Sequence, residues 1–95
     1  MIDFQIFRDR SGAAIITVSG ELKASNCDYF FRCVDDLIKE GFREIIIDCE
    51  DLGFVSSHCW GRLVASRRRA TRQGGFVYLV YLQSIAVMMF LLQFH

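Results

Sequence analysis

Residues 54–63 read FVSSHCWGRL, and this stretch decides the fold because it leads from an expected strand into an expected helix. The β-branched run at residues 44–49 is typical of a strand that is buried on both faces, and residues 50–53 are expected to be its connection to the helix. Ser56 or Ser57 is then expected to cap the helix. The unpaired N–H groups and positive dipole at such a helix start would also accept a phosphate carried by a serine.

Two interpretations of these serines are open at this point. A serine at the start of a helix often does no more than accept a hydrogen bond from the backbone of the first turn. A phosphorylated serine would add about −1.5 to −2 charges, which disrupts a protein interface while the helix end keeps the domain folded. The spacing of the residues is the same in both cases.

The composition predicts one compact domain without a general attraction to polyanions. The chain has 95 residues, of which 53% are hydrophobic, and its formal net charge is zero. The helix expected over residues 57–73 carries a stripe of arginines: Arg62, Arg67, Arg68, Arg69 and Arg72. Without an interleaved aromatic platform, the stripe does not indicate nucleic-acid binding. It is interpreted as a solvated face partly paired with Asp35, Asp36 and Glu40, or as a basic edge for an acidic protein.

No metal site, cofactor or active site is expected. The four cysteines, at positions 27, 33, 49 and 59, lack C-x-x-C spacing, and the chain has only two histidines. The cysteines are interpreted as buried or partly buried free thiols, which suggests a reducing compartment. Since the N-terminal residues do not form a signal peptide, the protein is expected to be cytoplasmic. His58 follows Ser57 directly, but neighbours on a helix point apart and no third group orients them, so the protein is not expected to be an enzyme.

The periodicity along the chain predicts an α/β fold. Strands are expected at residues 2–7 and 13–18, as an antiparallel hairpin whose second strand ends with residues 19–22. The hairpin is followed by a helix from Asn26 to Gly41, a strand at 43–49, the helix at 57–73, a strand at 76–82 and a last helix at 85–94. The order β-β-α-β-α-β-α predicts a mostly parallel four-stranded sheet with an antiparallel edge strand and helices packed alongside.

The apolar run from Ile85 to Leu92 is the most hydrophobic part of the chain. Its eight residues are far fewer than the roughly 20 that a membrane-spanning helix needs. A helix that is apolar on all sides must be buried or covered by a partner. The run therefore predicts either burial or a homodimer formed through this segment.

Several motifs in this order resemble the STAS domain family, named for sulfate transporters and anti-sigma factor antagonists. The residues that carry the resemblance are Val18-Ser19-Gly20-Glu21-Leu22, Ile45-Ile46-Ile47-Asp48, Phe54-Val55-Ser56-Ser57 with Gly61, and Arg68-Arg69-Ala70 with Gly74-Gly75. The resemblance implies a single STAS-like domain over residues 1–95 that ends before the family's last C-terminal element.

The resemblance also implies a function. Family members that are anti-sigma factor antagonists bind an anti-sigma factor that is also a serine kinase, and phosphorylation of a serine at the start of the second helix releases them. A gap-free match places that serine at Ser57. Lys23, Ser56, Ser57, His58, Trp60 and Arg62 are expected to form the partner-binding surface, with Trp60 partly buried.

The chain departs from the family pattern around this serine. His58, Cys59 and Trp60 replace smaller residues, Lys23 replaces an aspartate, and Ser56 stands where aspartate is usual. These replacements remove both acidic positions near Ser57. They keep open the alternative of a STAS scaffold or transporter-associated subunit that binds partners without a phosphorylation switch.

Overall fold

The structure is a computed structural model and describes residues 2–80. The described elements, in chain order, are β1 (Ile2–Arg8), β2 (Ala13–Leu22), α1 (Cys27–Lys39), β3 (Glu44–Val55), α2 (Ser57–Arg72) and β4 (Phe76–Val80). This order confirms the predicted β-β-α-β-α-β. The end of the predicted strand 76–82, the predicted helix 85–94 and the apolar run 85–92 lie outside the described residues.

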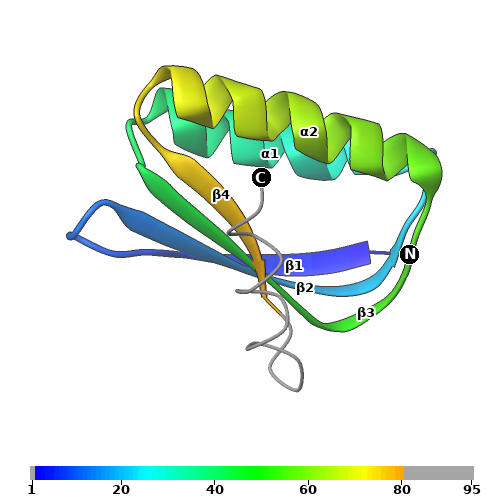
Figure 1. Cartoon of the computed structure of the whole chain (residues 1–95). Coiled ribbons are helices and arrows are strands. Elements are labelled where there is room, and N and C mark those ends of the chain that lie inside the picture. Colours follow the sequence, from blue (N-terminus) through cyan, green and yellow to red (C-terminus); the bar gives the residue numbers. More distant parts are fainter. Residues whose placement is uncertain (1, 81–95) are drawn as a thin grey trace.

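The four strands form one mixed sheet in the order β1-β2-β3-β4. The edge strand β1 pairs with β2 in an antiparallel hairpin, whereas β2, β3 and β4 are parallel. The sheet therefore matches the predicted one. Because the chain crosses from β2 to β3 and from β3 to β4 in the same direction, right-handed connections place both helices on the same face, as Figure 1 shows.

The core lies between this face of the sheet and the two helices. Alternate residues of β3, namely Ile45, Ile47 and Cys49, point toward the helices and are buried. Ile46 and Asp48 point the other way and are only partly buried. Among residues 2–80 the helices cover one face of this strand only, so the predicted cover of its second face is not tested by the described residues.

The strand β3 is longer than its apolar run indicated. Residues 50–53, predicted as a connection, continue the strand and pair with the end of β2, up to the pair Leu22 and Val55. Two register shifts interrupt this pairing, and Gly20 beside one of them has a φ of 97°, which favours glycine. The ends of β2 and β3 curve toward the start of α2 (Figure 1), which brings the predicted site to one end of the molecule.

None of the helices within residues 2–80 is long and apolar enough to cross a membrane.

Candidate functional site

The start of α2 is attached directly to the end of the sheet. Ser56 occupies the N-cap position, and its backbone N–H donates to the carbonyl of Leu22 at 2.9 Å. Its hydroxyl does not cap the helix but lies 3.2 Å from the sulfur of Cys59. The capping prediction is thus correct for the position of Ser56 and wrong for its side chain, because the buried thiol competes for the hydroxyl.

Ser57 is the first residue of α2, and it is exposed. Its hydroxyl forms no hydrogen bond with any other residue in the part of the chain that the structure describes. Since the side chain of Ser56 does not bind the N–H groups of the first turn, these groups and the positive end of the helix dipole face the surroundings of Ser57. A negative group on this serine would therefore be stabilised locally.

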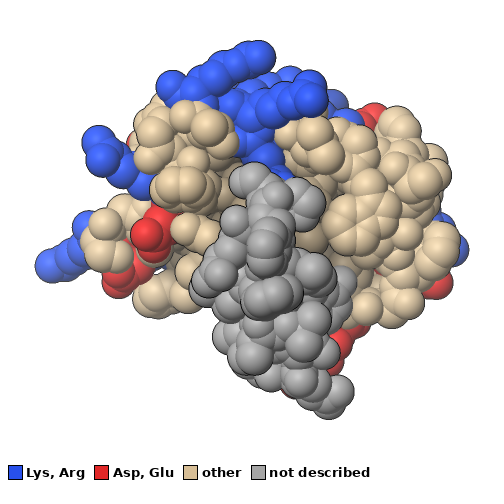
Figure 2. All heavy atoms as spheres, in the orientation of Figure 1, with Lys and Arg blue, Asp and Glu red and all other residues tan. Residues whose placement is uncertain are grey.

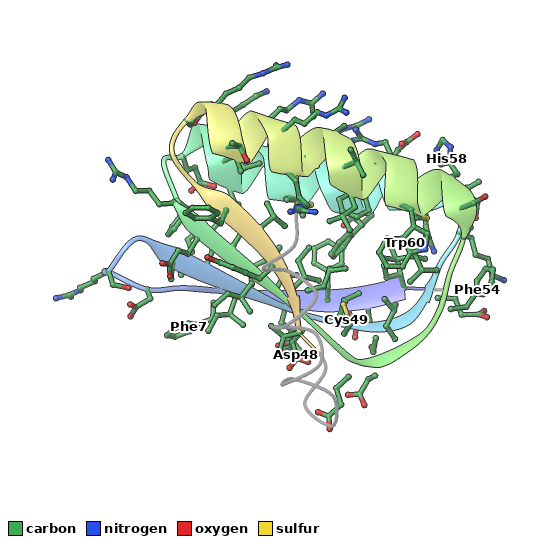
Figure 3. The ribbon with its side chains drawn as sticks, in the orientation of Figure 1. Phe7, Asp48, Cys49, Phe54, His58 and Trp60 are labelled. Atoms are coloured by element: carbon green, nitrogen blue, oxygen red, sulfur yellow. The ribbon has the colours of Figure 1, made fainter. Side chains whose placement is uncertain are left out.

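His58 and Trp60 leave α2 on different sides. Successive helical residues are rotated by about 100°, so positions 58 and 62 share one face, and position 60 points away from it. Figure 3 shows Trp60 on the sheet side of α2 and His58 on the far side. His58 and Arg62 both approach Asp28 of α1, with distances of 3.8 and 2.9 Å to its Oδ1.

Trp60 borders an apolar hollow between α2 and the sheet. The hollow is small, with a volume of about 20 Å³, and Leu52, Val55 and Leu79 also line it. Trp60 is 45% exposed and so belongs to the exposed large apolar residues, whereas partial burial was predicted. Phe54, at the end of β3, is 48% exposed. This end of the molecule therefore offers apolar surface on the sheet side of α2.

Lys23 lies at the same end, just after β2. Its side chain is exposed and pairs with Glu21 at 3.3 Å. Its backbone N–H donates to Oδ1 of Asn26, whose amide nitrogen donates to the carbonyl of Glu21. Asn26 holds the N-cap position of α1 as predicted, but its side chain closes this turn and does not cap the helix.

A polar seam joins α1 to α2. Asp35 is 9% exposed and accepts a 2.9 Å hydrogen bond from the hydroxyl of Ser66. It also pairs with Arg69 and, at 3.6 Å, with Arg62. The predicted pairing of the arginine stripe with the first helix is confirmed for Asp35. Glu40 instead pairs with Arg8 of β1 at 3.3 Å.

The remaining arginines of the stripe lie on the surface. Arg67, Arg68 and Arg72 line a shallow depression together with Val64 and Thr71. Figure 2 shows basic side chains gathered along this upper side of the molecule, over α2. Arg62, predicted as a contact residue, is only 23% exposed and is already engaged by two acids of α1.

Buried thiols lie beneath the same end. Cys27 and Cys59 are fully buried, and Cys49 is nearly so, as predicted for these residues. Burial and the hydrogen-bonded thiol of Cys59 raise the pKa of Cys27 to about 11. Burial also raises the pKa of the partly buried Cys33. Cys27, Cys33 and Cys59 are free thiols.

The sequence interpretation missed Asp28 and Phe54 as members of this surface. A signal for Asp28 was present, because Asp28 and Asp35 are seven residues apart and share a face of α1. Arg62, Ser66 and Arg69 have the complementary spacing on α2. Phe54 was quoted only as part of a family motif, and residues 50–53 before it were interpreted as a connection instead of a strand.

Residues 6–93 match the STAS domain. The chain belongs to the STAS domain family. No curated protein matches this STAS domain at a significant level. Its fold resembles that of an anti-sigma factor antagonist from Mycobacterium paratuberculosis, with 17% identity, coverage of 98% of this chain and 78% of that one, and a TM-score of 0.74.

Two further solved structures have the same fold. The anti-sigma factor antagonist SpoIIAA in its unphosphorylated form is 22% identical, with 97% and 79% of the two chains covered and a TM-score of 0.73. A putative anti-sigma factor antagonist from Thermotoga maritima is 22% identical, with 96% and 79% covered and a TM-score of 0.74. At these identities the likeness establishes the fold of this STAS domain, and its function requires a separate argument.

Proposed function

We propose that this STAS domain is a regulatory module that works by binding another protein and has no catalytic activity. Its partner is an anti-sigma factor, as the names of its structural neighbours suggest, and the family resemblance implies that this partner is also a serine kinase. The cell compartment is the cytoplasm, consistent with the free thiols of Cys27, Cys33 and Cys59. The observation that carries the proposal is the exposed Ser57 at the first position of α2.

The proposed contact surface surrounds this serine. Lys23, Ser56 and His58 lie at the same end of the molecule, and Trp60 contributes apolar area beside the hollow. Trp60 is the best candidate for an anchor, because tryptophan is enriched among the residues that contribute most to binding. Arg62 supports the surface from below through its ion pairs with Asp28 and Asp35.

Phosphorylation of Ser57 is the proposed switch. A phosphate would be tolerated by the folded domain, because it lies at the positive end of the α2 dipole. The same charge would be desolvated in a complex, which weakens binding. A solved structure of SpoIIAA with this fold is of the phosphorylated form, so a protein with this fold accepts a phosphate.

The test uses a purified anti-sigma factor with serine kinase activity and ATP. Mass spectrometry should locate one phosphate at Ser57, and the Ser57→Ala variant should stay unmodified. In calorimetric titrations, Ser57→Ala should bind the partner and Ser57→Asp should bind at least about tenfold more weakly. Ser11→Asp, which places the same charge in the turn between β1 and β2, is the matched control and should bind normally. Phosphorylation elsewhere, or equal binding of the two Ser57 variants, would contradict the switch.

A scaffold function without a switch is the second candidate. The exposed Phe54 and Trp60 and the apolar hollow favour it, since binding through them needs no charged group. In that case Trp60→Ala should weaken binding, and Ser57→Asp should not. Self-association through residues 85–92 is a further proposal, which sedimentation at high protein concentration would test.

A further inference from the structure

Three metal-ligating side chains meet where the N-termini of α1 and α2 lie side by side. The sulfur of Cys27, a carboxylate oxygen of Asp28 and an imidazole nitrogen of His58 all lie within 4.8 Å of one another. Cys27 and Asp28 are the first two residues of α1, and His58 is the second residue of α2. The packing of the two helices brings together ligands that are about thirty positions apart in the sequence.

A thiolate, an imidazole and a carboxylate are ligands that zinc accepts. Zinc–ligand bonds of about 2.0–2.3 Å place two ligands of a tetrahedral ion about 3.5 Å apart. The three atoms, now within 4.8 Å of one another, would approach to this distance by rotation of their side chains. The thiolate and the carboxylate together neutralise the charge of a divalent ion, and a water molecule would take the fourth position.

The surroundings of the three residues suit this role. The thiol of Cys59 is hydrogen-bonded to that of Cys27 and touches the hydroxyl of Ser56 at 3.2 Å, which orients the sulfur ligand. Arg62 and His58 approach Oδ1 of Asp28, at 2.9 and 3.8 Å, so the carboxylate already lies beside the imidazole that would share the ion. The buried sulfur lies below the exposed carboxylate and imidazole, so an ion arriving from solvent meets those two groups first.

We propose that Cys27, Asp28 and His58 form a binding site for a divalent transition metal of the zinc type. An ion bound there would link the first turns of α1 and α2 directly beside Ser57. The site follows from side-chain positions and does not depend on the proposed function.

Cobalt(II) is the probe for the test, because a thiolate ligand and tetrahedral geometry give it a characteristic absorption spectrum. The full chain, reduced and stripped of metal, should bind one equivalent of cobalt. Thiolate-to-cobalt charge transfer should appear in the near ultraviolet and intense ligand-field bands in the visible. Zinc should abolish both signals and raise the thermal unfolding midpoint.

Variants separate this site from accidental binding. His58→Ala removes an exposed ligand without affecting the core, and it should weaken cobalt binding by more than about tenfold, since even loss of an outer-shell partner typically costs that much. Cys27→Ser should abolish the charge-transfer band. Cys33→Ser, a thiol elsewhere on α1, is the matched control and should bind as the wild type does. A spectrum without charge transfer in the wild type, or unchanged binding by His58→Ala, would overturn the proposal.

Discussion

Ser66 of α2 donates a 2.9 Å hydrogen bond to Asp35 of α1, and both residues are buried at the helix–helix contact. Arg69 and Arg62 complete the partners of this carboxylate. A buried carboxylate is stable in this position only because charged and hydroxyl donors surround it. The polar contact therefore sets which faces of the two helices meet.

Replacing Asp35 tests the contribution of this seam to stability. Asp35→Ala should lower the free energy of unfolding by about 2 kcal/mol, which is below the 3–5 kcal/mol of a fully buried pair because water can reach Arg69 once the acid is gone. Urea denaturation followed by the fluorescence of Trp60 measures the change. Asp36→Ala, an exposed acid on the same helix, is the control and should stay within about 0.5 kcal/mol of the wild type. Equal effects of the two variants would contradict the role of Asp35.

Two glycines of the second half of the chain should respond to alanine in opposite ways. A Cβ atom on Gly75 would lie 2.6 Å from the carbonyl oxygen of Arg43, whereas one on Gly61 meets nothing within 4 Å. Gly75→Ala should therefore cost about 1–3 kcal/mol of stability, and Gly61→Ala, within α2, should add about 0.5–1 kcal/mol. Thermal unfolding of both variants checks this, and a shift of the same sign in both would contradict it.

Charge at position 57 should affect stability even without a partner. Ser57→Asp places a negative group at the start of α2 and should stabilise the domain by about 0.3–1 kcal/mol, whereas Ser57→Lys should destabilise it by a similar amount. Chemical denaturation at low and high salt measures both effects, which salt should reduce. If the aspartate and lysine variants are equally stable, the dipole of α2 does not act on this position.

The turn between β1 and β2 provides a prediction about pH. Hydrogen bonds from the hydroxyl and the backbone N–H of Ser11 hold the pKa of Asp9 below its ordinary value of 3.8. Ser11→Ala should raise this pKa, and an NMR titration of the Asp9 carboxyl would detect the change. Because the pKa of Asp9 is lower in the folded state, its carboxylate contributes stability at pH values above the ordinary pKa, and this contribution is lost as the pH falls through the folded pKa. The pH dependence of stability from this group is therefore confined to acid. An Asp9 pKa that does not differ between wild type and variant would contradict the hydrogen bond.

The element order could be predicted because each element carries its own local signal. The spacing of Phe30, Val34, Leu37 and Ile38 indicates a helix, and this spacing is a property of neighbouring residues alone. The longer reach of β3 could not be predicted in the same way. Apart from Leu52, residues 50–53 are acidic or glycine, and they become a strand only because the end of β2 lies beside them.

The candidate site was predicted in part. The resemblance placed Ser57 at the helix start, and the structure exposes it there. The sequence interpretation assigned no role to Asp28 and expected no metal site at Cys27. Their proximity to His58 depends on how α1 packs against α2, and sequence spacing does not encode that distance.

The sequence by itself determined the strands, the helices and their parallel arrangement, because the alternation of apolar residues and the turn residues act over short distances. Only the tertiary structure decided that His58 faces Asp28 and Cys27, while Trp60 faces the hollow above the sheet. The physical reason is that the sequence gives the angular position of each side chain around a helix. The element that packs against the helix decides which side is covered.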